Sequence, residues 1–369
     1  MLSLEAKKTF HFSLHSLLNL IVSNSMECYT LLIFKEIKRF MEIPQDLQEA
    51  IEELSAEYSL RDLQEAALDL SGQYRRKESH TSRFMESAAH RVAYLASRMP
   101  ATCAAISHCL KAFRKIAADI QVRSLLDLGA GPGSVLWMAK EIFPEIEEAT
   151  LIEQDSELIR LGKKLLSNSQ KTAPFDVKWR AGDLSSELDL DCHDLVSLSY
   201  VIGELDTDSQ KKIIQKAWEK TSKILLIVEP GTPDGFERIM QARDLLISEG
   251  AYILAPCPHS KACPMRGTDK WCHFKERLQR GKIHRSLKQA SLSYEDENFS
   301  YLVVSRQNYP LNEDRVVGHP QKKSGHLRLE LCTENGLLQK TVSKRHKELY
   351  RLSKKLSWGE GVPRSLSEN

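Results

Sequence analysis

The feature that most constrains the fold is a regular alternation of short apolar runs with amphipathic stretches, which begins at residue 122. Runs typical of buried strands lie within 122–134, 148–155, 175–184, 193–205 and 223–231. Stretches with apolar residues at three- and four-residue spacing separate them, at 134–145, 156–168, 210–221 and 234–250. Strands that alternate with helices predict an α/β fold, a Rossmann-like parallel sheet with helices on both faces.

The segments around this core divide the chain further. Residues 1–40 match no clear pattern, and we interpret them as a flexible extension or a start codon assigned too far upstream. Residues 41–120 have a helical pattern and predict a helical N-terminal domain, with Pro100 opening a new helix. Residues 121–310 form the α/β domain, with a cysteine-rich insertion at 255–290. Residues 311–369 predict a small β unit closed by a basic helix.

Composition bounds the class of protein. With 41% apolar and 28% charged residues in 369, the chain is typical of a soluble globular protein, and no stretch is long and apolar enough to predict a membrane span. Eight cysteines in a chain this long do not make a disulfide scaffold. Without a recognisable secretory signal sequence we expect a reducing compartment, where clustered cysteines indicate a metal or catalysis.

A glycine-rich turn marks a candidate nucleotide site. Asp127, Gly129, Gly131 and Gly133 form D-x-G-x-G-x-G between the first strand and its helix. Glycines at such a turn let the backbone approach a ligand closely. Glu153 ends the next strand, where an acid can bind ribose hydroxyls.

The same residues favour S-adenosylmethionine over NAD. Asp127 is placed to hold the amino end of a methionine moiety, and Asp183 follows the third strand, where an acid can meet the adenine amino group. The pyrophosphate-binding pattern G-x-G-x-x-G would need glycine at position 134, which is Ser134. A doubly wound domain that has lost its ligand is the alternative.

Catalysis is not fixed by the sequence. Methyl transfer needs little beyond positioning, because the sulfonium is already activated. The fourth strand ends in SYVIGEL, which lacks both the [DN]-P-P-[YFW] motif and the paired cysteines of known base methyltransferases. Tyr200 and Glu204 could face a substrate, or could simply pack or start a helix. The catalytic residues are therefore unassigned.

A second candidate site lies in APCPHSKACPMRGTDKWCHF, residues 255–274. It holds Cys257, Cys263 and Cys272, three thiolate ligands that need a fourth to close a zinc site or an iron–sulfur cluster. His259, His273 and the more distant Cys332 are candidates for the fourth. Zinc ribbons usually show C-x2-C pairs, so the looser spacing here favours a cluster.

The region around these cysteines is basic, although the whole chain carries a formal charge of only +2. Residues 257–290 contain two acids and nine basic side chains: Lys261, Arg266, Lys270, Lys275, Arg277, Arg280, Lys282, Arg285 and Lys288. This imbalance predicts an anionic partner.

The motifs together resemble the ribosomal small-subunit Rsm-type methyltransferase-like family, which comprises mitochondrial small-subunit assembly proteins and their bacterial relatives. The resemblance covers residues 43–362 and is carried by SGQYR, AYLASRMPAT, DLGAGPGS, DLVSLSYVIGEL, VEPGTPDGF, ENFSYLVVSR, YRLSKKLSWGE and, most specifically, by APCPH…CP…WCHF followed by LCTENG. It implies a class I methyltransferase sheet.

The resemblance also implies a 4Fe–4S cluster held by Cys257, Cys263, Cys272 and Cys332, and binding to small-subunit ribosomal RNA on the assembling small subunit. Three activities remain open: an RNA methyltransferase, a non-catalytic iron–sulfur assembly factor, and a zinc-bearing methyltransferase of a ribosomal protein. We expect a monomer off the ribosome and no membrane partner. The predicted location is the bacterial cytoplasm, or the mitochondrion if the chain is eukaryotic.

Overall fold

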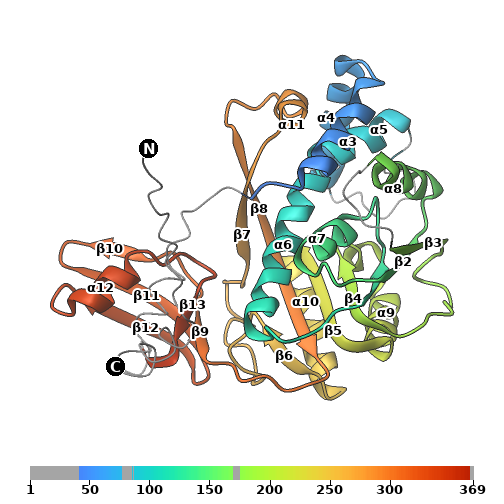
Figure 1. The fold of residues 1–369 in the computed structure, drawn as a ribbon. Helices are drawn as coiled ribbons and strands as arrows, with labels where there is room; N and C mark the ends of the chain where they lie inside the picture. The colour runs from blue at the N-terminus through green and yellow to red at the C-terminus, as the bar shows by residue number, and fades with distance from the viewer. Residues whose placement is uncertain (1–40, 77–84, 86, 169–174, 366–369) are drawn as a thin grey trace, which may run out of the picture. The chain divides into compact units, whose positions relative to one another are not determined.

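The computed structural model describes residues 41–76, 85, 87–168 and 175–365 (Figure 1). The residues from Met41 onward form one compact unit. The predicted extension at 1–40 lies outside the described residues.

Four helices occupy the first part of this unit, as the periodicity predicts: α3 (Gln45–Ala56), α4 (Leu60–Arg76), α5 (Ala88–Ser97) and α6 (Met99–Ile116). The Ser87 side chain caps α5 by accepting from the backbone N–H of His90, and Pro100 lies in the first turn of α6, where a missing N–H is tolerated. Helix α6 is buried along most of its length and packs on α7 and the sheet.

The main sheet has the strand order β3-β2-β1-β4-β5-β8-β6. Its strands are β1 (Ser124–Leu128), β2 (Glu148–Glu153), β3 (Asp176–Ala181), β4 (His193–Ser199), β5 (Thr221–Pro230), β6 (Tyr252–Ala255) and β8 (Tyr294–Ser305). The first five are parallel neighbours, and β8 runs antiparallel between β5 and β6. This is the strand order of class I methyltransferase sheets, so the predicted fold class is confirmed.

Side-chain alternation explains why helices cover both faces of the sheet. On β1, Leu125 points into the core shared with α3–α7, whereas Leu126 and Leu128 point into the core shared with the helices of the other face. The connecting helices are α7 (Ser134–Ile142), α8 (Ser156–Asn168), the short 3₁₀ helix η1 (Ile202–Glu204), α9 (Thr207–Glu219) and α10 (Pro233–Ser248). The core is thus continuous from the N-terminal helices into the sheet.

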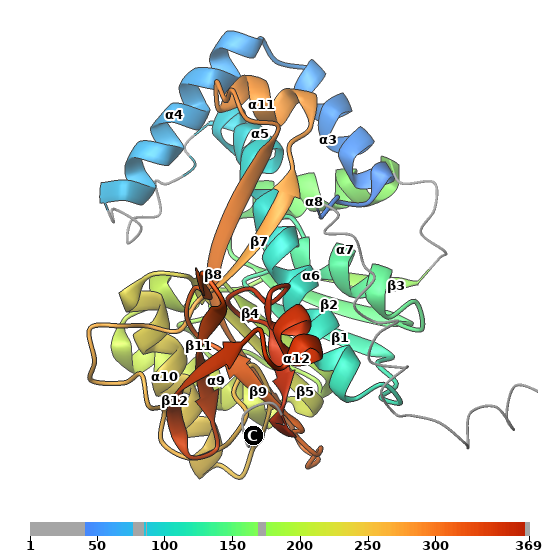
Figure 2. The ribbon, with the colours of Figure 1, turned by 90° about the vertical axis from the view of Figure 1, so that its left-hand side faces the viewer.

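The predicted cysteine-rich insertion is only partly irregular. Its second half forms β7 (Phe274–Gln279), which pairs with the first half of β8, and α11 (Lys282–Leu287). Figure 2 shows the β7–β8 ribbon carrying α11 away from the sheet and up to α4 and α5, which it contacts. The irregular cysteine loop is confined to residues 256–273.

The C-terminal part forms a second, smaller sheet, as predicted. Its strands are β9 (Glu313–Val316), β10 (Gln321–Lys323), β11 (His326–Thr333), β12 (Gly336–Ser343) and β13 (Gly361–Pro363), and α12 (Lys347–Ser353) packs against β11 and β12. Leu327, Leu329 and Leu331 of β11 point into a core that Leu356 helps to close. The predicted turn at ENG joins β11 to β12. No helix in the described ranges is long and apolar enough to cross a bilayer.

Candidate cofactor cleft and cysteine pocket

The glycine turn lies between β1 and α7, where the sequence places it. Gly129, Gly131 and Gly133 all have positive φ, which favours glycine. A Cβ on Gly129 would collide with Val201, whereas the position of a Cβ on Gly131 has no atom within 4 Å. Gly129 therefore permits close packing, and Gly131 borders open space that a ligand can fill.

Asp127 is the last residue but one of β1, beside this turn, and is almost completely buried. Its Oδ1 accepts a 2.6 Å hydrogen bond from the Ser197 hydroxyl, but its Oδ2 has no hydrogen-bond partner among the described residues. Burial raises the pKa of Asp127 to about 7, and the charge of Glu153 adds to the rise. A buried carboxylate oxygen without a donor fits a site completed by a cationic ligand.

Glu153 ends β2 and braces the turn. Its Oε2 accepts from the N–H of Gly131 at 2.8 Å, and its Oε1 accepts from the N–H of Asp155 at 2.9 Å. Burial raises its pKa although these N–H groups oppose the rise. Since each carboxylate oxygen can accept a second hydrogen bond, the side chain can still receive ribose hydroxyls.

Asp183 lies just beyond the end of β3 and is exposed. Its Oδ1 accepts from the backbone N–H and the hydroxyl of Ser185, and these bonds lower its pKa. The residue thus stabilises its own turn through one oxygen, which leaves the other for a ligand.

Two further acids lie at the carboxyl ends of β4 and β5. Glu204 in η1 is open to solvent, yet surrounding protein and the charges of Glu153 and Glu229 raise its pKa to about 7. Glu229 on β5 is fully buried and accepts a 2.6 Å hydrogen bond from Arg238 of α10. The carboxyl edge of the sheet is therefore strongly acidic.

Tyr200 follows β4 with a φ of 59°, which is unusual for a residue with a side chain. Its hydroxyl donates to Glu297 of β8 at 3.1 Å, and Glu297 also pairs with Arg98. Burial, together with the charge of Glu297, raises the Tyr200 pKa well above its usual value. Tyr200 is thus held by β8 and is not a free acceptor-site hydroxyl.

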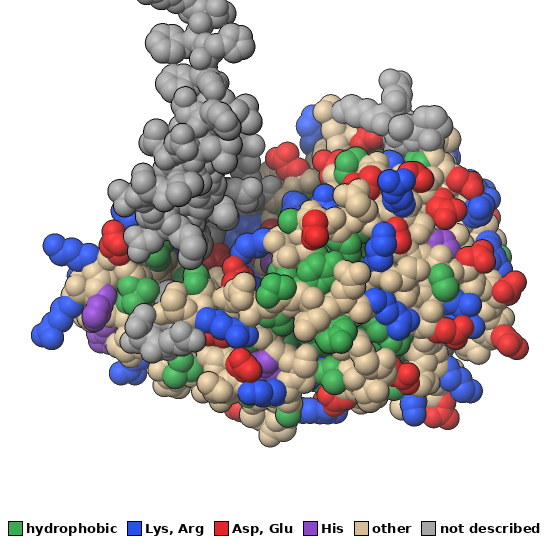
Figure 3. Space-filling model, turned by 60° about the horizontal axis from the view of Figure 1, so that its bottom comes forward, with side chains coloured by type: hydrophobic (Ala, Val, Ile, Leu, Met, Phe, Trp, Pro, Cys, Tyr) green, Lys and Arg blue, Asp and Glu red, His purple; other side chains and the backbone are tan. Residues whose placement is uncertain are grey.

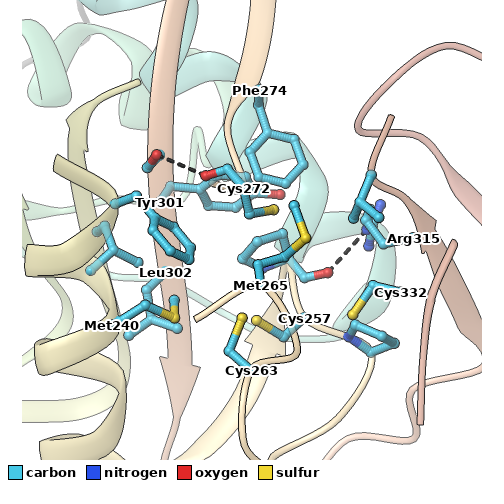
Figure 4. A pocket seen from close by; sticks show the side chains of 16 residues that line it. Met240, Cys257, Cys263, Met265, Cys272, Phe274, Tyr301, Leu302, Arg315 and Cys332 are labelled. Atoms are coloured by element: carbon cyan, nitrogen blue, oxygen red, sulfur yellow. Dashed lines mark hydrogen bonds between the residues drawn. The ribbon is translucent and has the colours of Figure 1, made fainter. Parts of the chain in front are cut away.

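The four predicted cysteine ligands line one pocket between α10, β8, the cysteine loop and the C-terminal sheet (Figure 4). The pocket encloses about 490 Å³, part of it open to solvent, and its other walls are largely apolar. Cys332 comes from β11 and lies 60 residues after Cys272 in the sequence. Burial raises the pKa of Cys332 to about 12, and proximity to Cys257 and Cys263 contributes.

Hydrogen bonds to the loop backbone fix the pocket. The Ser300 hydroxyl donates to the carbonyl of Cys272, and the Arg315 guanidinium donates to the carbonyl of Pro256 (Figure 4). Arg243 of α10 is only 1% exposed and donates to the carbonyls of His259 and Lys261. Two arginines therefore tie the loop to α10 and to the C-terminal sheet.

The two histidines behave differently from each other. His259 lies with its Nε2 3.7 Å from the Cys332 sulfur, whereas His273 stacks between Trp271 and Trp358. Across the described residues, no three His, Cys, Asp or Glu side chains are close enough together to hold a single metal ion.

The sequence profile described as "Mitochondrial small ribosomal subunit Rsm22" matches residues 88–363, well over half of the chain. The chain belongs to this family. The resemblance predicted from the motifs is therefore confirmed.

Named relatives agree with the family assignment. The human "Ribosome assembly protein METTL17, mitochondrial" is 27% identical over 294 residues, covering 73% of this chain and 62% of the human protein. The Saccharomyces cerevisiae "Ribosome assembly protein RSM22, mitochondrial" is 23% identical over 238 residues, covering 37% of this chain and 38% of that protein. The chain thus spans less than two thirds of each of these Rsm22-family relatives. Both relatives are named as mitochondrial proteins, so the predicted location in the bacterial cytoplasm has no support.

Solved structures resemble the chain only loosely. The magnesium protoporphyrin IX methyltransferase of Synechocystis PCC 6803 has a TM-score of 0.34 at 11% identity and covers 55% of this chain and 79% of its own. An O-methyltransferase family protein of Burkholderia thailandensis has a TM-score of 0.38 at 14% identity and covers 62% of each chain.

The basic segment 257–290 differs from the prediction. Seven of its nine cations pair with carboxylates: Lys261, Arg266, Lys270, Lys275, Arg277, Arg280 and Lys288. Most of these acids come from outside the segment, such as Asp296 and Glu295 of β8, which a count within the segment misses. Most of the positive charges that suggested an anionic partner therefore form ion pairs within this Rsm22-family chain.

Several site residues escaped the sequence reasoning. Glu229 follows an apolar run, as Asp127 and Glu153 do, and this shared pattern could have predicted a third acid at the carboxyl edge of the sheet. Arg243 lies four residues after Ile239 and three before Leu246, on the buried stripe of its helix, where a charge indicates a buried partner. No pattern in the neighbouring sequence indicated that Arg315 or Glu297 would belong to a site.

The buried Asp127 predicts a pH dependence. The unfolded chain ionises this carboxyl near pH 4, whereas the folded chain does so near pH 7, so folding retains a proton between these values and the free energy of unfolding falls as pH rises. As the pH rises from 5 to 8, we expect the free energy of unfolding of Asp127→Asn to increase by on the order of 2 kcal/mol relative to that of wild type. Urea unfolding of both proteins at the two pH values measures this. A difference that is independent of pH would contradict it.

Proposed function

We propose that this chain acts in assembly of the mitochondrial small ribosomal subunit, where it binds small-subunit ribosomal RNA, S-adenosylmethionine and a 4Fe–4S cluster. The observation that carries the proposal is the convergence of Cys332 on the three cysteines of the loop. Cysteines that are far apart in the sequence line one pocket in the fold, and they are the four residues that the family resemblance names.

The acidic carboxyl edge of the sheet supports S-adenosylmethionine over NAD. S-adenosylmethionine brings a sulfonium and an ammonium, whereas NAD brings an anionic pyrophosphate. Asp127, Glu153 and Glu204 would attract the first and repel the second, whereas Glu229 is already paired with Arg238. The unpartnered Oδ2 of Asp127 would accept from the ligand's ammonium, and the open space at Gly131 would admit the ligand.

The cysteine pocket supports a cluster over zinc. Four cysteines line one pocket, and their sequence spacing lacks the C-x2-C pairs that zinc ribbons usually show. A cluster there would pin the loop, and the positive charges of Arg243 and Arg315 would offset its negative charge.

Two activities remain candidates. Glu204 favours methyl transfer, because a solvent-open carboxyl with a pKa near 7 can accept a proton from a methylated group. The Tyr200 hydroxyl favours a non-catalytic assembly factor, because it is bound to Glu297 and is not available to a substrate. S-adenosylmethionine would then be a structural or sensing ligand.

Rescue of depleted cells separates these activities. Wild type, Gly131→Arg and Cys263→Ser would each replace the endogenous protein, with small-subunit sedimentation and ribosomal RNA methylation as readouts. We expect Cys263→Ser to reduce mature small subunits at least tenfold, since the loop loses its ligand. Loss of one nucleotide's methylation with Gly131→Arg would identify an enzyme, and normal assembly and methylation with Gly131→Arg would identify an assembly factor. Normal subunits with Cys263→Ser would contradict the proposal.

A further inference from the structure

A group of unpaired positive charges lies on the C-terminal β unit. Eight exposed side chains carry them: Lys322, Lys323, Lys344, Arg345, Lys347, Arg351, Lys354 and Lys355. We call them the C-terminal basic surface. None of the eight forms an ion pair with a described carboxylate; Lys354 instead lies 5.9 Å over the ring of Tyr350. This contrasts with the internally paired segment 257–290.

Backbone pairing gathers the first half of this surface at one end of the small sheet. Lys323 pairs with His326 across the β10–β11 turn, and His326 pairs with Ser343 at the end of β12. The N–H of Lys344 then donates to the carbonyl of Gly325 at 2.9 Å. Two turns that are distant in sequence thus place Lys322, Lys323, Lys344 and Arg345 together.

Helical periodicity extends the surface along α12. Lys347, Arg351, Lys354 and Lys355 follow one another at spacings of four, three and one residues, so they share one side of the helix and of the turn that continues it. Leu349 and Leu356 belong to the opposite, core-facing side. In Figure 3 several blue side chains project from the left-hand edge, where the C-terminal β unit lies, with red beside them.

We propose that the C-terminal basic surface binds the phosphate backbone of RNA, and so is the site through which the chain contacts small-subunit ribosomal RNA. The proposal rests on the function proposed above and adds its contact surface. Unpaired, exposed cations need no rearrangement to meet phosphates, whereas the cations of 257–290 would first have to leave their carboxylates.

The same surface is unsuited to a membrane. Interfacial helices pair their cations with large apolar side chains that enter the lipid. The exposed large apolar residues of the described chain are Leu60, Leu68, Tyr252, Leu292 and Leu337. Only Leu337 belongs to the small sheet, and it lies beside the β11–β12 turn, at the opposite end of β12 from Lys344.

The test measures the affinity of the purified full chain for a fragment of small-subunit ribosomal RNA over a range of salt concentrations. The variant combines Lys344→Gln, Arg345→Gln, Lys347→Gln and Arg351→Gln. The control removes the same charge from four exposed lysines elsewhere, Lys111→Gln, Lys163→Gln, Lys211→Gln and Lys212→Gln. All eight positions are exposed, so both variants should fold as wild type does.

We expect the variant to bind about 100-fold more weakly near 0.15 M salt and to lose about three from the slope of log affinity against log salt. The control should keep the wild-type slope. Equal slopes for variant and wild type would show that the C-terminal basic surface is not the RNA-binding site, and would leave the proposed function intact. A wild type that binds no RNA would contradict the RNA partner itself. Binding to anionic lipid vesicles in preference to RNA, lost in the variant, would assign the surface to a membrane and overturn the proposal.

Discussion

Cys332→Ser is expected to remove bound iron from the chain, although residue 332 lies 60 residues beyond Cys272, the nearest cysteine of the loop. Cys332 is the one pocket cysteine supplied by the C-terminal sheet, so its loss opens the pocket on that side. We expect at least a tenfold loss of iron per chain, measured on anaerobically purified protein. Cleavage by trypsin at Arg266 or Lys270 should accelerate by on the order of tenfold, because the loop would lose its anchor.

Other cysteines provide matched controls for that result. Cys192 is exposed and outside the pocket, so Cys192→Ser should retain iron and resist trypsin as wild type does. Cys103 is buried in α6, and Cys103→Ser should lower stability without removing iron. If Cys332→Ser and Cys192→Ser hold equal iron, the fourth ligand is not Cys332, and the nearby His259 becomes the next candidate.

Gly131→Arg should abolish binding of S-adenosylmethionine while leaving the fold intact. A side chain at this position would extend into the open space beside the turn, where the ligand is proposed to lie. The positive charge would also neutralise the acidic edge that attracts the ligand. We expect at least a 100-fold loss of affinity, about 2.7 kcal/mol, by calorimetry or equilibrium dialysis.

Gly250→Arg is the control for backbone strain. Gly250 lies two residues after the end of α10, has a φ of 81° and, like Gly131, would place a Cβ in open space. Both variants thus carry a comparable cost of about 1–2 kcal/mol for a left-handed residue. Equal loss of affinity in the two variants would mean that strain, and not the cleft, explains the effect.

The sheet was predictable because its signals are local. The short apolar runs of β1 and β5, and the glycine that follows each of them, are visible in a window of ten residues. The position of β8 between β5 and β6 was not predictable, because an antiparallel return depends on pairing between distant residues, such as Leu225 and Val304, which lie 79 residues apart.

The site was predictable to different degrees for the same reason. Asp127 and Glu153 lie at the carboxyl ends of β1 and β2, where the pattern places them. The charge of 257–290 misled because β8 supplies Glu295 and Asp296, which only the folded ribbon brings opposite Arg280 and Arg277. Sequence shows how many charges a segment has; the fold decides which remain unpaired.

Metal analysis of the wild-type chain tests the central claim most directly. The protein would be purified without oxygen, and its visible absorbance, iron, sulfide and zinc measured per chain. The proposed 4Fe–4S cluster predicts a brown protein with about four irons and four sulfides and no stoichiometric zinc. A colourless protein with about one zinc, or with no metal, would contradict the cluster and return the four-cysteine pocket to an unassigned role.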